Sequence, residues 1–228
     1  MSQRQLVSYC FYKIDPAWRL RTEEQRCADK REFAEAVQRF ADEMLVRTYT
    51  TVGTRGDADL LIWRATDDVT LLTKATAAIN HTSLAPYLRS PYHYLAMTRR
   101  SIYVTRHVHA GQEGTRTRIR PKDAPYLIVY PFVKTRPWYA LDKEERQKMM
   151  DVHIEVGHKY PSVKINTTYS FGLDDQEFVV AFETDNLADF LDLVMELRET
   201  AASMYTLRDT PTFTCQRMDL AEALDLIG

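Results

Sequence analysis

One predicted order of strands and helices occurs twice in this chain, once in each half. Alternating apolar and polar residues predict strands, and apolar residues at three- and four-residue steps predict helices. The first half reads strand, helix, strand, strand, helix, strand, at residues 6–14, 23–44, 45–52, 58–63, 67–79 and 92–98. The second half reads the same, at residues 126–134, around His153, and at 163–171, 177–183, 187–200 and 210–216. Each half therefore has the β-α-β-β-α-β order of a ferredoxin-like unit.

Two such units in one chain can pack sheet against sheet or join their edges into a barrel. We expect an α+β fold built as a duplicated ferredoxin-like repeat (dimeric α+β barrel), with two β-sheets and the helices outside. The predicted halves are residues 1–106 and 126–228, joined by a linker at 107–125 that is rich in Arg, Gly and Thr. A sheet closed in this way protects its edges and leaves a cavity lined by strands and one helix.

Composition narrows the function classes. A formal net charge of −2 argues against a general nucleic-acid binder, whose affinity depends on clustered Lys and Arg. The basic stretch 116–122 is an exception, and it is either a solvated loop or a site for carboxylates. Three scattered cysteines indicate reduced thiols, the polar first residues lack a secretory signal, and no apolar run reaches the ~20 residues of a membrane span. We therefore expect a cytoplasmic protein without a membrane span.

His153 is the most informative single residue. Asp142 can cap its helix, and Glu145 can complete a capping box. Helical spacing places one set of residues inward, namely Met149, Met150, His153, Val156, Gly157 and Tyr160, and another set toward water, namely Lys143, Glu144, Gln147, Lys148 and Asp151. An inward imidazole must bond to a carbonyl, a carboxylate or a metal. Periodicity alone favours a satisfied core histidine over a metal or haem ligand, and the spacing of the other histidines indicates no conventional zinc cluster.

Several spaced motifs resemble the chlorite dismutase family, which contains chlorite-decomposing haem enzymes and coproheme decarboxylases. The motifs are the segment 138–146, the run 150–153, the pair Gly157 and Tyr160, and Gly172-Leu173-Asp174-Asp175 followed by 178–184. The resemblance implies the duplicated ferredoxin-like barrel and a homo-oligomer, usually a pentamer and sometimes a dimer. It also implies that His153 is the proximal iron ligand of a haem and that Trp138 packs near the porphyrin.

Within this family, the distal side distinguishes the branches. The chlorite enzymes carry an arginine in a Val-Lys-Arg pattern, whereas this chain has Val163-Lys164-Ile165-Asn166, so either Ile165 or Asn166 faces the iron. The decarboxylases carry a Tyr-Pro-Met-x-Lys pattern, and this chain has Tyr130-Pro131-Phe132-Val133-Lys134. The glutamate that makes the proximal histidine more anionic in the chlorite enzymes is replaced by Ala201 or Ala202. By contrast, the loop between Lys134 and Trp138 is as short as in the chlorite enzymes, and Phe132 replaces the methionine of the decarboxylase pattern.

The resemblance therefore implies a peroxide-dependent coproheme decarboxylase that produces haem b. In this hypothesis Tyr130 relays the oxidation to a propionate, Lys134 supplies or receives a proton, and Arg116, Arg118 or Arg120 holds the remaining carboxylates. The cofactor is an iron porphyrin, either haem b or coproheme, and the partners are that porphyrin and hydrogen peroxide. The alternatives are a chlorite dismutase or weak haem peroxidase, a non-enzymatic haem carrier or sensor, and a barrel that has lost haem altogether.

Overall fold

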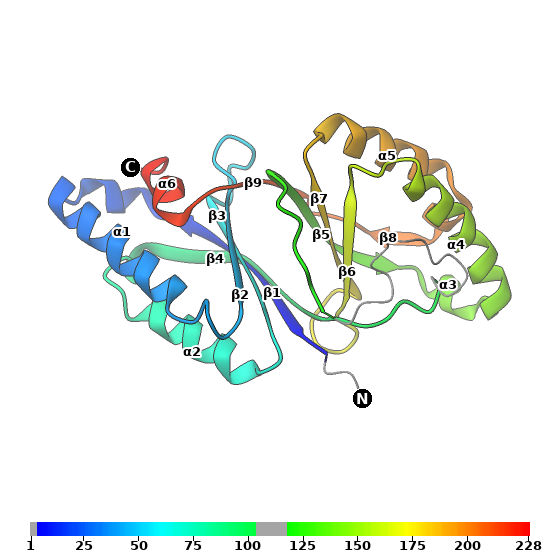
Figure 1. Ribbon diagram of the computed structural model, residues 1–228, viewed down its shortest axis with the longest axis horizontal. Helices are drawn as coiled ribbons and strands as arrows, with labels where there is room; N and C mark the ends of the chain where they lie inside the picture. The colour runs from blue at the N-terminus through cyan, green and yellow to red at the C-terminus, as the bar shows by residue number, and fades with distance from the viewer. Residues whose placement is uncertain (1–3, 104–117) are drawn as a thin grey trace. The chain divides into compact units, whose positions relative to one another are not determined.

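The chain forms two compact units, which are shown in the computed structural model of Figure 1. The structure describes residues 4–103 and 118–228. The first unit contains Met1–Met97 together with Phe213–Gly228, and the second contains Thr98–Thr212. Arg116, His107, His109 and most of the predicted linker lie outside the described residues, so the structure does not test their predicted roles.

The first unit is an antiparallel sheet with helices packed on it (Figure 1). Its strands pair in the order β4-β1-β3-β2-β9. The strands are β1 (Leu6–Ile14), β2 (Leu45–Thr50), β3 (Leu60–Thr66), β4 (Leu88–Met97) and β9 (Phe213–Arg217). The α-helices are α1 (Glu23–Gln38), α2 (Val69–Asn80) and α6 (Leu220–Asp225), and the short 3-10 helices are η1 (Pro16–Leu20) and η2 (Ala85–Tyr87).

The second unit has the same construction, with strands paired in the order β6-β7-β5-β8. Its strands are β5 (Tyr126–Lys134), β6 (Lys164–Tyr169), β7 (Phe178–Thr184) and β8 (Thr206–Arg208). Its helices are α3 (Arg136–Ala140), α4 (Lys143–His158), α5 (Leu187–Glu199) and the 3-10 helix η4 (Ala201–Tyr205). Both units therefore show the predicted β-α-β-β-α-β order, and the α+β, ferredoxin-like fold class is confirmed.

Several predicted element boundaries were wrong. The helix predicted at 23–44 ends at Gln38, and the strand predicted at 210–216 begins at Phe213. Pro211 has no N–H for a strand ladder, which explains the later start. The end of the chain was placed in the second half, but Phe213–Gly228 groups with the first unit. The cause is apolar burial, since Leu220 and Leu224 belong to that unit's core.

The two units match residue by residue through their first strand and helix. β1 begins at Leu6 and β5 at Tyr126, 120 residues later, and both strands are 9 residues long. α1 begins at Glu23 and α4 at Lys143, again 120 residues later, and both helices are 16 residues long. With this offset, the position that His153 occupies in α4 is occupied in α1 by Phe33.

These two matched positions have opposite surroundings. Phe33 is completely buried in the core of the first unit, where its ring meets that of Tyr12 edge-on at 6.3 Å between centroids. His153 is only partly buried and lines a cavity. At this matched position, an aromatic side chain fills the core of the first unit, whereas the second unit has an open cavity.

This contrast predicts that truncating the two side chains to alanine lowers the free energy of unfolding by different amounts. Phe33→Ala should lower the free energy of unfolding by about 3 kcal/mol, because it removes a fully buried ring and leaves a void. His153→Ala should cost about 1 kcal/mol or less, because that side chain already borders open space. Urea titrations of the two variants measure the difference, with Leu20→Ala as a control because Leu20 is 88% exposed. Equal losses for Phe33→Ala and His153→Ala would contradict the contrast.

Candidate active site

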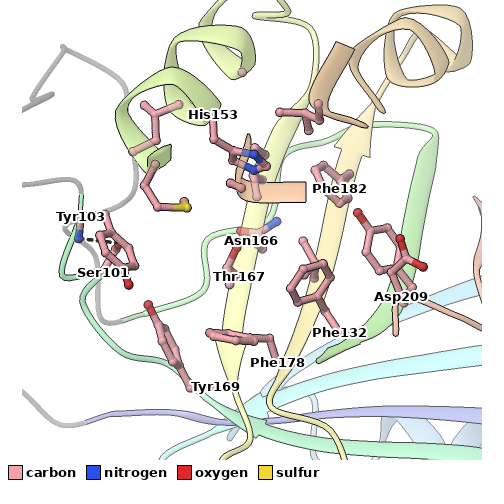
Figure 2. Close-up of a pocket in the computed structure, with 18 of the residues that line it drawn as sticks. Ser101, Tyr103, Phe132, His153, Asn166, Thr167, Tyr169, Phe178, Phe182 and Asp209 are labelled. Carbon is pink, nitrogen blue, oxygen red and sulfur yellow. Dashed lines mark hydrogen bonds between the residues drawn. The ribbon is translucent and has the colours of Figure 1, made fainter. Parts of the chain in front are cut away.

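A cavity of about 1150 Å³ lies within the second unit, between α4 and one face of the sheet. This volume is above the ~300–1,000 Å³ of ordinary small-molecule pockets. The strand register identifies the sheet face, because Tyr130 pairs with Val180 and Val180 with Thr167. Figure 2 shows His153 on the helix across from Phe132, Phe178 and Phe182. The cavity is therefore a wide space between one helix and an aromatic sheet face.

His153 reaches this cavity because its helix is well defined. The carboxylate of Asp142 accepts a hydrogen bond from the backbone N–H of Glu145 at 2.8 Å, which is one of the two bonds of the predicted capping box. The predicted inward face is largely as expected, but Gln147 was assigned to water and is buried. Its side-chain amide donates to the Tyr103 carbonyl at 3.0 Å and to the Asp151 carboxylate at 2.6 Å. Hydrogen-bonding partners on the chain account for its burial.

The imidazole of His153 has the properties of an unprotonated ligand. Its Nδ1 is buried and has no hydrogen-bond partner among the described residues. Burial, and to a smaller extent the positive charge of Lys134, lower the pKa of His153 from 6.5 to about 4. A neutral imidazole on the wall of an open cavity is the form that binds a metal ion. An orphaned buried nitrogen of this kind also indicates that a group is missing from the site.

The lowered pKa predicts how stability depends on pH. Between pH 6.5 and about pH 4, the unfolded chain binds a proton at His153 and the folded chain does not, so stability falls as pH is lowered through that window. His153→Gln should flatten this part of the profile. Urea unfolding at a series of pH values measures the slope, and His81→Gln, at an exposed position, is the control. A His153→Gln slope equal to that of the unmodified protein would refute the assignment.

Lys134 and Trp138 lie next to each other in the second unit. The ammonium of Lys134 donates to the carbonyl of Ala202 at 2.7 Å and lies 4.5 Å from the Trp138 ring centroid. Burial lowers the pKa of Lys134 to about 8, and the charge of Glu177 partly opposes this. Trp138 is 3% exposed and packs against Tyr205. Ala202, at one of the two positions predicted to replace the family's glutamate, contributes its carbonyl to this cluster and lines the cavity.

Tyr130 lies on the sheet side of the cavity. Its ring stacks on Phe182 with 5.7 Å between centroids. Burial raises the pKa of Tyr130, and the charge of Asp209 raises it further. Asp209 forms an ion pair with Arg198, and both line the same part of the wall. The phenol therefore stays protonated in an apolar setting with one carboxylate in the same wall.

Ile165 and Asn166 are both among the residues that line the cavity. Ile165 pairs with Phe182 and is 41% exposed, on the cavity face of β6. Asn166 is 6% exposed, and its amide donates to Glu183 at 2.9 Å. Neighbouring strand residues point to opposite faces, so the buried amide of Asn166 is directed toward Glu183 while Ile165 lies on the face of Phe182. Ile165 is therefore the more exposed of the two on this wall.

The basic side chains differ in part from those predicted. Arg118 lines the described wall of the cavity, whereas Arg120 is not among its lining residues and instead accepts a hydrogen bond from Lys164 at its backbone carbonyl. Seven basic side chains line this wall against one carboxylate, Asp209; they are Arg99, Arg118, Lys122, Lys134, Arg146, Lys164 and Arg198. The sequence analysis missed Arg146, although it precedes His153 by two helical turns. The cavity wall is therefore suited to an anionic ligand.

An iron porphyrin fits these residues. The macrocycle is flat, apolar and carries carboxylates at its edge, and the cavity offers a neutral imidazole, an aromatic face and surplus cations. No cluster of His, Cys, Asp and Glu in the described chain could hold a metal ion without such a cofactor. Within the same residues, no helix is long and apolar enough to cross a membrane.

Comparison with known proteins agrees with this class of site. The family described as chlorite dismutase matches residues 26–218. A coproheme decarboxylase from Mycolicibacterium smegmatis is 32% identical over 173 residues, which is 75% of this chain and 72% of the relative. Chlorite dismutase from Candidatus Nitrospira defluvii in complex with imidazole superposes with a TM-score of 0.87 at 26% identity, covering 98% of this chain and 94% of the other.

A variant of that enzyme superposes with a TM-score of 0.90 at 24% identity, covering 100% of this chain and 96% of the other, which supports the fold alone. The family match covers most of the chain. This protein therefore belongs to the chlorite dismutase family.

Proposed function

We propose that this protein is a coproheme decarboxylase, which uses hydrogen peroxide to convert two propionates of iron coproporphyrin into the vinyl groups of haem b. The observation that supports this choice best is Tyr130, a partly buried phenol in the cavity wall. The coproheme decarboxylase relative points to the same reaction. The family resemblance adds the expectation of a homo-oligomer, with a pentamer favoured, and the sequence composition adds that of a cytoplasmic protein.

The charge of the cavity supports a substrate with several carboxylates. Seven basic side chains line the described wall of the cavity, and one carboxylate, that of Asp209, lines it with them. Buried or partly buried cations are stabilised when an anion pairs with them. Coproporphyrin carries four carboxylates, whereas haem b carries two. Arg118, which was predicted to hold a carboxylate, is among these cations, and Arg99 and Lys122 join it.

Each residue can be given a role in this reaction. His153 would hold the porphyrin iron, and Trp138 and Ile165 would border the macrocycle. Bound iron coproporphyrin, together with peroxide, supplies the oxidising power that amino-acid side chains lack. Tyr130 gives up an electron and its phenolic proton, then recovers both from a propionate side chain. Lys134, whose pKa of about 8 lies near neutrality, can hold or release a proton at Nζ.

The overall chemistry balances for each propionate. The side chain loses carbon dioxide, one proton and two electrons, and a carbon–carbon double bond forms between its two remaining carbons. Peroxide accepts two electrons and two protons and becomes two molecules of water. One proton is therefore consumed from the surroundings for each vinyl group formed.

Titration of the purified protein with iron coproporphyrin, followed by peroxide, tests the proposal. The Soret band should shift on binding, and mass spectrometry should show the loss of two carboxyl groups. Unchanged coproporphyrin after peroxide addition would refute the decarboxylase assignment.

The chlorite dismutase reaction is the second candidate, because the solved structures similar to this chain include chlorite dismutases. The cavity argues against it, since Ile165 and Asn166 line it from β6 where the chlorite enzymes carry an arginine. An oxygen electrode separates the two reactions, and we expect little oxygen from chlorite. Reversible haem exchange without turnover would instead indicate a haem carrier.

A further inference from the structure

Arg146 lies on the same face of α4 as His153. Among the residues that line the cavity from this helix, Arg146, Met150, His153 and Gly157 follow one another at steps of four, three and four. Seven residues of α-helix span about 10.5 Å. Arg146 therefore borders the cavity two turns before the proposed iron ligand.

The guanidinium of Arg146 has N–H donors that its one hydrogen bond within the described chain does not use. Among the described residues its hydrogen-bond partner is the backbone carbonyl of Asp142, at 3.4 Å from Nε, and no carboxylate pairs with it. Glu144 and Glu145, its neighbours in sequence, are exposed and do not line the cavity. The N-terminal end of a helix adds partial positive charge. An arginine in this setting is suited to binding a carboxylate through two parallel hydrogen bonds.

Tyr130 lies toward the other end of the same helix. It packs against the apolar cluster that contains Val156, with Tyr160 also packed on that cluster, and both of these residues follow His153. A porphyrin held by His153 would border Arg146 before that residue on the helix and Tyr130 beyond it. Arg146 and Tyr130 would then meet different carboxylates of the porphyrin.

We propose that Arg146 is a substrate-positioning residue, which binds a carboxylate of the porphyrin that the reaction leaves intact. This inference rests on the proposed function for the identity of the ligand as a carboxylated porphyrin. By holding one edge of the macrocycle, Arg146 fixes which propionate lies beside Tyr130. The residue thus contributes to specificity without contact to the reacting atoms.

Fluorescence titration with metal-free coproporphyrin tests this role, because the probe has the carboxylates but no iron for His153 to bind. Arg146→Met should weaken binding about tenfold, since it removes a charge-assisted hydrogen bond and keeps the apolar stem. Arg146→Lys should lose less, because it keeps the charge. Lys148→Met is the matched control, since Lys148 is exposed on the same helix. The tetramethyl ester of coproporphyrin should bind the unmodified protein and Arg146→Met equally.

Two results would overturn the inference. One is that Arg146→Met binds coproporphyrin as tightly as the unmodified protein does. The other is that Arg146→Met loses as much affinity for the ester as for the free acid, which would indicate a packing role. Neither result bears on decarboxylation, which is measured separately with iron coproporphyrin and peroxide. Conversely, an inactive protein whose Arg146→Met variant loses coproporphyrin affinity would refute the proposed function and leave the carboxylate anchor in place.

Discussion

Tyr130→Phe should abolish vinyl formation from iron coproporphyrin while leaving porphyrin binding intact. The substitution removes one oxygen from a partly buried ring that stacks on Phe182, so the shape of the cavity is retained. Phenylalanine cannot give up an electron and a proton as phenol does, so the proposed relay is lost. We expect the rate of carbon dioxide loss to fall at least about 10³-fold, which corresponds to about 4 kcal/mol in the barrier.

Mass spectrometry of the porphyrin after peroxide addition measures this effect. Tyr126→Phe is the control, because Tyr126 lies on the same strand and is not among the residues that line the cavity. The control should form vinyl groups at the normal rate. Vinyl formation by Tyr130→Phe at more than about a tenth of the normal rate would exclude Tyr130 as the relay.

His153→Ala should lose the axial bond to iron. We expect affinity for iron coproporphyrin to fall about 100-fold, or about 2.8 kcal/mol, because the macrocycle would be held by its edges and apolar contacts alone. The Soret band of any complex that remains should differ from that of the unmodified protein. Added imidazole should restore the spectrum, because the substitution leaves room for it beside the cavity.

His81→Ala provides the comparison for this variant, since His81 is an exposed histidine in the first unit. Its complex should have the spectrum and affinity of the unmodified protein. An unchanged spectrum for His153→Ala would show that another group binds the iron.

Much of the fold could be predicted because alternation and helical spacing are local signals. The strands Leu6–Ile14 and Tyr126–Lys134 have the bounds that their apolar patterns predict. The chain end could not be assigned in this way. Whether Phe213–Gly228 packs with the first or the second unit depends on tertiary burial, here that of Leu220 and Leu224, and not on a local pattern.

The position of the cavity was only partly predictable. Periodicity places both Phe33 and His153 on the inner faces of their helices, and it cannot show that one site is filled and the other open. That difference depends on how neighbouring side chains pack. The first unit places completely buried Trp18 and Phe33 in its core, whereas the second places His153 on the wall of an open space.

The strand register explains why the distal side chain was left open in the sequence analysis. Ile165 and Asn166 are neighbours, and a shift of one residue exchanges the faces of a strand. Only the pairing of Ile165 with Phe182 fixes the face. Arg146, by contrast, could have been found from the sequence, because it stands two turns before His153 on the same helix.

The most direct test of the account is a crystal structure of the protein with iron coproporphyrin, with the iron located by its anomalous scattering. We predict an iron peak in the cavity between α4 and the sheet, within bonding distance of an imidazole nitrogen of His153. An iron peak outside this cavity, or one bound by a different side chain, would contradict the account.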